Sequence, residues 1–109
     1  MEVKRKVVYM GERDVIQEAR TKIETLQTAF SRECKASHDA FRFKENLDQM
    51  LKVLLKAQRI DNHLLIELEK FYQAASLLIG LGGLALNEET FQSWRAYDHW
   101  HYEVVKPQL

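Results

Sequence analysis

A thiol and an imidazole stand four positions apart in the first half of the chain, at Cys34 and His38. On a continuous helix this spacing places both side chains on one face, and a thiolate and an imidazole are suitable ligands for Zn²⁺. Further ligand types occur at His63, Asp98, His99 and His101. Because the chain has one Cys, no His-Glu-x-x-His motif and no repeated Glu-x-x-His pair, we expect no metal and no other cofactor. A metal-responsive helical module that uses Cys34 and His38 is a third hypothesis.

A second pair of reactive side chains, Arg95 and His101, is separated by five residues near the C-terminus. This spacing resembles the active-site motif of the HEPN ribonucleases, in which paired Arg and His residues at a dimer interface cleave RNA. The resemblance covers seven residues and implies a dimeric ribonuclease with Arg95 and His101 as its catalytic residues. The sequence departs from the family pattern at Ala96, where a polar residue is frequent. On an unbroken helix the two side chains would also point about 120° apart.

Three glycines, Gly80, Gly82 and Gly83, follow a segment with helical periodicity. A phosphate-binding loop follows a strand and ends in Lys and then Ser or Thr, and this segment has neither feature. The glycines instead predict the end of a helix and a turn. No serine with a base at a suitable spacing and no closely paired acids can be identified, so the sequence favours a non-enzymatic protein over an enzyme.

The elements that would position these residues are four helices. Apolar residues recur at intervals of three and four, which predicts amphipathic helices over residues 11 to about 36, 38 to about 59, 62 to 80 and from 88 onward. Residues suited to capping a helix N-terminus precede the last three helices. These residues are Ser37, His38 and Asp39, then Asp61 or Asn62, and finally Asn87.

The third predicted helix is expected to be the central one, because its apolar residues form a stripe about 140° wide. Glu69, Lys70 and Gln73 fall on the opposite face, where we expect a solvated surface. Ile66 and Leu77 fall on that opposite face as well. Exposed apolar residues are common, so these two are only a hint of a second contact surface.

The C-terminal residues 99–104 alternate polar with apolar side chains, a pattern that fits a half-buried strand as well as a helix. Val3, Val7 and Tyr9 alternate similarly near the N-terminus, so the termini could pair as a short two-stranded ribbon that packs on helices or across a dimer. The predicted fold class is all-α: a compact four-helix bundle-like domain over residues 1–109, with the terminal ribbon as an open alternative.

The charges of the chain are balanced, with sixteen acidic and sixteen basic side chains. The chain therefore lacks the positive stripe typical of proteins that bind nucleic acid through phosphate contacts, and nucleic acid is disfavoured as the partner. The single Cys excludes an intrachain disulfide, and the first residues lack the apolar core of a signal peptide, so we expect a cytoplasmic location.

Between Lys70 and Glu88 the chain runs for seventeen residues without a charged side chain, although charged residues make up 29% of the sequence. The segment is too short and too broken by Gly, Gln and Ser for the ~20 apolar residues that cross a bilayer, so no membrane span is expected. Its second half and the two following Trp residues hold more apolar area than a small bundle obviously needs, and large aromatic side chains are favoured interface anchors. The candidate interface residues are Leu77, Leu81, Leu84, Leu86, Trp94 and Trp100.

These features together predict a small cytosolic interaction protein rather than an enzyme. It would present a helical and aromatic surface to another protein, as an adaptor, an inhibitor or an immunity-type factor, and would form a homodimer. The dimeric ribonuclease that uses Arg95 and His101 is the alternative. The question left to the structure is whether the fourth helix or a second chain covers Leu81, Leu84 and Leu86.

Overall fold

The computed structural model describes the backbone of residues 2–109 and the side chains from residue 15 onward. Four α-helices make up most of the chain: α1 (Glu2–Ser31), α2 (His38–Lys56), α3 (Asn62–Ser76) and α4 (Glu88–Trp100). A π-helical turn follows α3 and another follows α4, namely η1 (Leu77–Leu81) and η2 (His101–Val105). A short 3₁₀ turn, η3 (Lys106–Gln108), closes the chain.

The all-α prediction is confirmed, because residues 2–109 contain helices and no strand. The terminal ribbon is not confirmed: the backbone is helical from Glu2 to Ser31, and residues 101–105 form η2. The side chains of Val3, Val7 and Tyr9, which the ribbon would use, lie outside the described side chains. None of the described helices has an apolar run long enough to cross a membrane.

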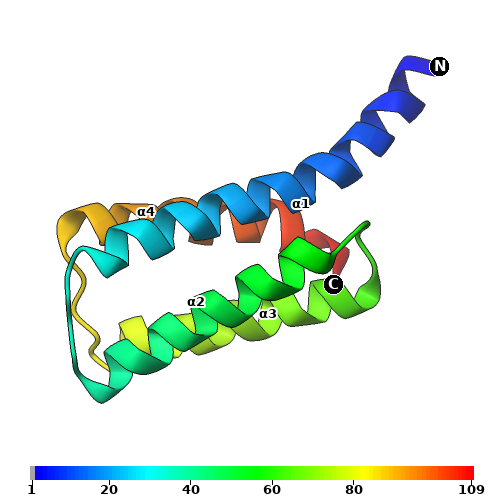
Figure 1. The fold of residues 1–109 in the computed structure, drawn as a ribbon. Helices are drawn as coiled ribbons and strands as arrows, with labels where there is room; N and C mark the ends of the chain where they lie inside the picture. The colour runs from blue at the N-terminus through cyan, green and yellow to red at the C-terminus, as the bar shows by residue number, and fades with distance from the viewer. Residues whose placement is uncertain (1) are drawn as a thin grey trace.

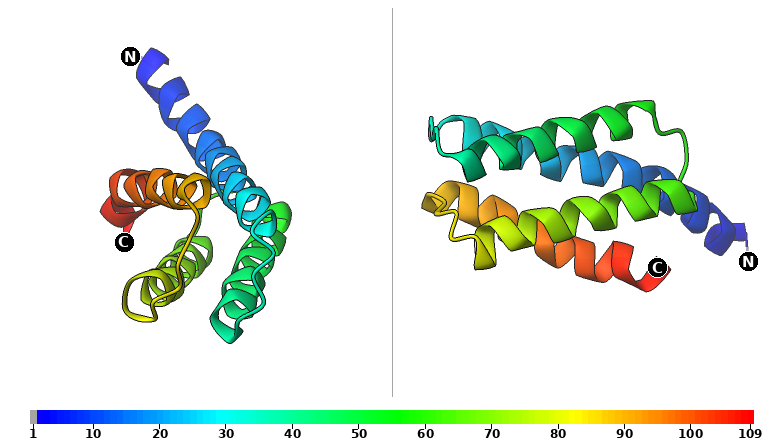
Figure 2. Two further views of the ribbon diagram at one scale, coloured as in Figure 1. Left: turned by 90° about the vertical axis from the view of Figure 1, so that its left-hand side faces the viewer. Right: turned by 90° about the horizontal axis from the view of Figure 1, so that it is seen from below.

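The four helices lie roughly along a common direction and surround a shared centre, as the end-on view in Figure 2 shows. Helix α1 packs against both α2 and α4, α2 packs against α3, and η2 returns against α3. The molecule is elongated, with principal extents of 51 × 24 × 22 Å. The first turns of α1 extend beyond the ends of the other three helices (Figure 1).

Helix α1 ends at Ser31, five residues before the predicted end near Ala36. The backbone N–H groups of Arg32 and Glu33 donate to the carbonyls three residues before them, which tightens the last turn. Cys34 then adopts φ 53°, a left-handed conformation that stops the helix. After this turn the predicted cap at Ser37 is confirmed, because its hydroxyl accepts the N–H of Ala40 at 3.1 Å.

Helix α3 starts as predicted, because the carboxylate of Asp61 accepts the N–H of Leu64 at 2.8 Å. At its other end the chain passes Gly80 and completes η1, in which the N–H of Gly82 donates to the carbonyl of Leu77 five residues earlier. A Cβ on Gly82 would lie 2.9 Å from the Leu78 carbonyl oxygen, so this close approach requires glycine. The turn itself is made one residue later, at φ +75°.

The core is one connected cluster of side chains drawn from all four helices. Ile23 of α1, Phe43 of α2, Leu68 of α3 and Tyr97 of α4 are fully buried. The Tyr97 ring meets Phe71 edge to face, with centroids 5.4 Å apart. Each fully buried apolar side chain of this size stabilises the fold by about 1.5–3 kcal/mol, so this cluster accounts for the packing of the helices against one another.

Candidate functional site

Four of the six candidate interface residues are partly or wholly covered by the chain itself. Leu84, Trp94 and Trp100 are each only 6% exposed, and Leu86 is half-buried. These four side chains all pack in or against the hydrophobic core. The fourth helix and the loop before it therefore supply most of the cover that the uncharged segment needs.

Leu77 and Leu81 are the two candidate interface residues that the chain leaves uncovered. Their side chains are 56% and 86% exposed, and Leu81 is the more exposed of the two. Both belong to η1, which contains no buried residue. Since residues four apart lie on the same side of a helix, these two leucines form one exposed apolar patch at the end of α3.

Ile66 extends this apolar surface along α3. It is 50% exposed and precedes Leu77 by eleven residues, which is close to three helical turns, so the two side chains share a face. We call the side of α3 and η1 that carries Ile66, Leu77 and Leu81 the α3 outer face. Ile66 and Leu81 are about 22 Å apart along the helix axis at 1.5 Å per residue.

The two Trp residues have structural partners inside the chain. The Trp100 indole N–H donates to the Glu18 carboxylate on α1 at 2.8 Å, which links the C-terminal end of α4 to the first helix. The Trp94 ring stacks on Tyr72 of α3, with centroids 5.8 Å apart. An indole that satisfies its N–H in this way is typical of a core position, and neither ring is presented to a partner.

A polar network between α3 and the C-terminal end of the chain surrounds His101. The His101 imidazole lies 2.9 Å from a Glu69 carboxylate oxygen through Nε2, and 3.1 Å from the Tyr97 hydroxyl through Nδ1. The other Glu69 oxygen accepts hydrogen bonds from Lys106 and Gln73, each at 2.8 Å. The His101 ring also stacks on Tyr72, with centroids 4.1 Å apart and planes within 6°.

Burial and hydrogen bonding set the protonation of this network. Burial acts to raise the pKa of Glu69, but hydrogen bonds from Lys106, His101 and Gln73 outweigh it and lower the pKa to about 2. Burial lowers the pKa of His101 below 6.5, against the opposing effect of Glu69. The network therefore holds an ionised Glu69 and a neutral His101 at pH 7. Nε2 carries the proton and donates to Glu69, so Nδ1 accepts from the Tyr97 hydroxyl.

A neighbouring pair closes the network on its other side. The Tyr72 hydroxyl donates to the Asp98 carboxylate at 2.6 Å. Burial, followed by this hydrogen bond, raises the pKa of Tyr72 to about 12. The Lys106 ammonium lies 5.7 Å from the centre of the Tyr72 ring, within the range of a cation–π contact. All members of the network thus have partners, and the arrangement joins α3, α4, η2 and η3.

The structure does not bring Arg95 and His101 together. Arg95 is exposed on α4, whereas His101 is fully buried and has both ring nitrogens engaged. A general acid or base must reach the proton that it transfers. In this arrangement His101 ties α3 to η2, and RNA cleavage by this pair would require the imidazole to leave its buried position.

Cys34 and His38 do not share a helix face, contrary to the premise of the metal hypothesis. Cys34 lies in the left-handed turn after α1, and His38 is the first residue of α2. Within the described side chains, residues 15–109, no group of three or more His, Cys, Asp and Glu residues is placed to hold a metal ion.

Two polar contacts join the loop after α1 to the loop before α4, and sequence reasoning missed both. The Glu33 carboxylate is almost fully buried and accepts the backbone N–H of Asn87 at 3.0 Å. Lys35 lies 3.3 Å from the other Glu33 oxygen and donates to the carbonyl of Ala85. The Asn87 side chain makes no cap bond, so the hydrogen bond from the Asn87 N–H to Glu33 fixes the start of α4 instead.

No protein-family model, no curated protein and no solved structure matches this chain. The functional conclusion therefore depends on the surfaces and contacts of the chain itself.

Proposed function

We propose that the chain is a small, non-enzymatic, cytosolic interaction protein whose four helices form a bundle, and that it forms a homodimer through the α3 outer face. The observation that carries this proposal is the exposure of Leu77 and Leu81 at 56% and 86%, whereas the other large apolar residues of the segment are buried in the core or partly covered by it. An exposed apolar patch of this kind loses its contact with water when a partner covers it, which favours association.

The spacing on α3 suits a symmetric contact between two copies. If two α3 outer faces meet antiparallel, with the two-fold axis near Gln73, Ile66 of each protomer lies opposite Leu77 and Leu81 of its partner. Such an isologous contact uses the same patch twice and closes on itself. Gln73 already donates to Glu69 within its own chain and is exposed to solvent, so it fits the polar centre of this contact. Because only a few apolar side chains take part, the dimer belongs to the weak, reversible class.

Sedimentation velocity across protein concentration tests this proposal. We expect the weight-average mass to rise from monomer toward dimer between about 5 and about 500 µM, the range appropriate to a weak contact. The double variant Leu77→Glu, Leu81→Glu should remain a monomer over the whole concentration range, because it places charges in the exposed apolar patch.

Leu55→Glu is the matched control for this experiment. Leu55 is 62% exposed but lies on α2, outside the α3 outer face, so its replacement should leave the mass curve unchanged. A wild-type chain that stays monomeric over the whole range contradicts the homodimer. Equal loss of dimer in the control and in the double variant would place the contact elsewhere.

A further inference from the structure

A groove runs along the outer side of α2 and α3. One hollow of about 380 Å³ lies between the two helices, and a second of about 410 Å³ lies beside the loop that joins them. Val53 lines both hollows, so they adjoin each other, and we call the pair the α2–α3 groove. The groove follows α2 from Asn46 to Lys56, about 15 Å at 1.5 Å per residue. This length corresponds to three turns of a docked helix.

The floor of the groove is apolar. Met50 and Val53 contribute from α2, and Phe71 and Ala74 contribute from α3. Ala57 and Leu64 continue this floor toward the loop. Amphipathic helices are bound by grooves of this kind, because their apolar residues at intervals of three and four fill the floor while their polar flanks meet the rim.

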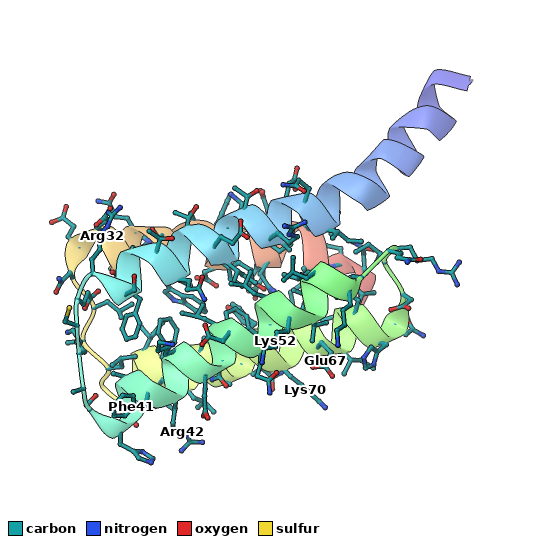
Figure 3. The ribbon with its side chains drawn as sticks, in the orientation of Figure 1. Arg32, Phe41, Arg42, Lys52, Glu67 and Lys70 are labelled. Carbon is teal, nitrogen blue, oxygen red and sulfur yellow. The ribbon has the colours of Figure 1, made fainter. Side chains whose placement is uncertain are left out.

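The rim of the groove carries more positive than negative charge. Three cations line it, Lys56, Arg59 and Lys70, and a fourth, Lys52, is exposed on α2 beside Val53. The anions at the rim are Glu67 and Asp61, and the Asp61 carboxylate also caps α3. Figure 3 shows Lys52, Glu67 and Lys70 along the middle of α2 and α3, on the side away from α1.

These rim cations are available to a partner. Within the described side chains, none of the four forms an ion pair with an acidic residue of its own chain. The contrast is clear on the neighbouring side of α2, where Lys44 pairs with Asp48 at 3.1 Å. Carboxylates on an incoming helix would meet unpaired ammonium and guanidinium groups, which favours an acidic partner over a basic one.

We propose that the α2–α3 groove binds one amphipathic helix of a partner protein, apolar along one side and acidic along its flanks. The rim alternates cations with Glu67 and Asp61 and the floor is apolar, so it lacks the unbroken positive stripe that a phosphate backbone requires. Helix binding in this groove rests on the proposed function, because it requires that the chain is an interaction protein, but it does not require the homodimer.

A displayed peptide library tests the proposal without a known partner. The library contains twelve-residue helical peptides with fixed apolar positions and freely varied flanks, and it is selected on the immobilised full-length chain. We expect the enriched flanks to be rich in Asp and Glu. A synthetic copy of the most enriched peptide should then lose about tenfold or more in affinity on Lys70→Glu or on Gln49→Trp. The first change reverses a rim charge, and the second fills the groove from an exposed position.

Controls separate the groove from other surfaces. Arg95→Glu reverses an exposed charge on α4 and should leave the affinity unchanged, and circular dichroism melts check that each variant folds. No enrichment, enrichment of basic flanks, or equal binding to Gln49→Trp would each overturn the proposal. Tighter binding of a labelled single-stranded oligonucleotide than of the peptide would overturn it as well, in favour of a nucleic-acid surface.

The same measurement distinguishes the groove from the homodimer. Peptide binding should persist in the monomeric Leu77→Glu, Leu81→Glu variant, because these residues do not line the groove. If the wild-type chain proves monomeric but binds acidic helices, the homodimer fails and the groove stands. If the peptide loses affinity for the Leu77→Glu, Leu81→Glu variant but not for the groove variants, the partner site is the α3 outer face and the groove proposal is wrong.

Discussion

The two π-helical turns of this chain have equal length and opposite environments. η1 follows α3 and η2 follows α4, and each has five residues. η1 contains no buried residue and presents Leu77 and Leu81 to solvent. η2 buries Val105 and His101 completely and lies against α3.

The difference shows that the π-helical backbone alone does not determine whether the side chains of such a turn are buried or exposed. A π turn adds a residue to the helical ladder and so redirects the side chains that follow. In η2 the redirected side chains meet Glu69 and Tyr72 of a packed neighbour. In η1 the chain is about to leave the helix at the turn around Gly83, so the redirected leucines meet water. One turn anchors the C-terminus, and we propose that the other recruits a second chain.

The largest expected effect comes from removing the anchor of η2. His101→Ala leaves a cavity and deprives the Tyr97 hydroxyl of its acceptor, so we expect the free energy of unfolding to fall by about 3 kcal/mol. His99→Ala is the matched control, because His99 is exposed and makes only a surface contact with Glu103. Urea denaturation measures both variants. Equal losses in the two would show that the buried network adds nothing to stability.

A smaller loss of stability is expected when one side chain of each π turn is truncated, and it compares η2 with η1 directly. Val105→Ala truncates a fully buried side chain of η2 and should lower the free energy of unfolding by about 2 kcal/mol. Leu81→Ala truncates the exposed side chain of η1 and should change it by less than about 0.5 kcal/mol. Both are measured by urea denaturation at a concentration where the chain is monomeric. A larger loss for Leu81 than for Val105 would reverse the comparison.

The pH dependence of stability tests the same buried network through its titratable groups. His101 has a pKa below 6.5 in the folded chain, so the unfolded chain takes up a proton first and stability begins to fall as pH drops below 6.5. The pKa of Glu69 is lowered from 4.5 to about 2, so its contribution is present above pH 4.5 and is lost as pH falls toward 2. We expect the melting temperature of the wild-type chain to fall in two stages on acidification.

His101→Gln sharpens the pH prediction, since glutamine cannot take up the proton. The variant should lose the first stage of the fall and keep the second. Melting curves between about pH 8 and about pH 3 measure both stages. A wild-type melting temperature that does not change between pH 7 and pH 5 would contradict the neutral, buried state of His101.

Periodicity predicted the helices well and their polar partners poorly. The starts of α2 and α3 follow from capping residues and hydrophobic spacing, which are local properties of the sequence, whereas α4 starts after Asn87 without a side-chain cap bond. Glu69 falls on the wet face of α3 when that helix is considered alone. In the folded chain η2 and η3 return to that side and bring His101 and Lys106 to it. A pattern within one helix carries no information about which other segment covers its edge.

The candidate interface residues show the same limit, because the sequence pattern does not reveal which of them another segment covers. Leu77 and Leu81 were predicted to be available to a partner, and they are exposed. Trp94 and Trp100 were grouped with them because large aromatic residues favour interfaces, but Glu18 and Tyr72 hold these rings inside the chain. Glu18 lies 82 residues from Trp100, so only the packing of α1 on α4 reveals the contact.

Hydrogen–deuterium exchange at two protein concentrations tests the central claim most directly. At high concentration the amides of residues 73–82 should exchange more slowly than at low concentration, because a second chain covers the α3 outer face. The amides of residues 101–105 should exchange at the same rate at both concentrations, because η2 is covered within its own chain. Exchange in 73–82 that does not depend on concentration, or a concentration effect confined to 101–105, would contradict the account.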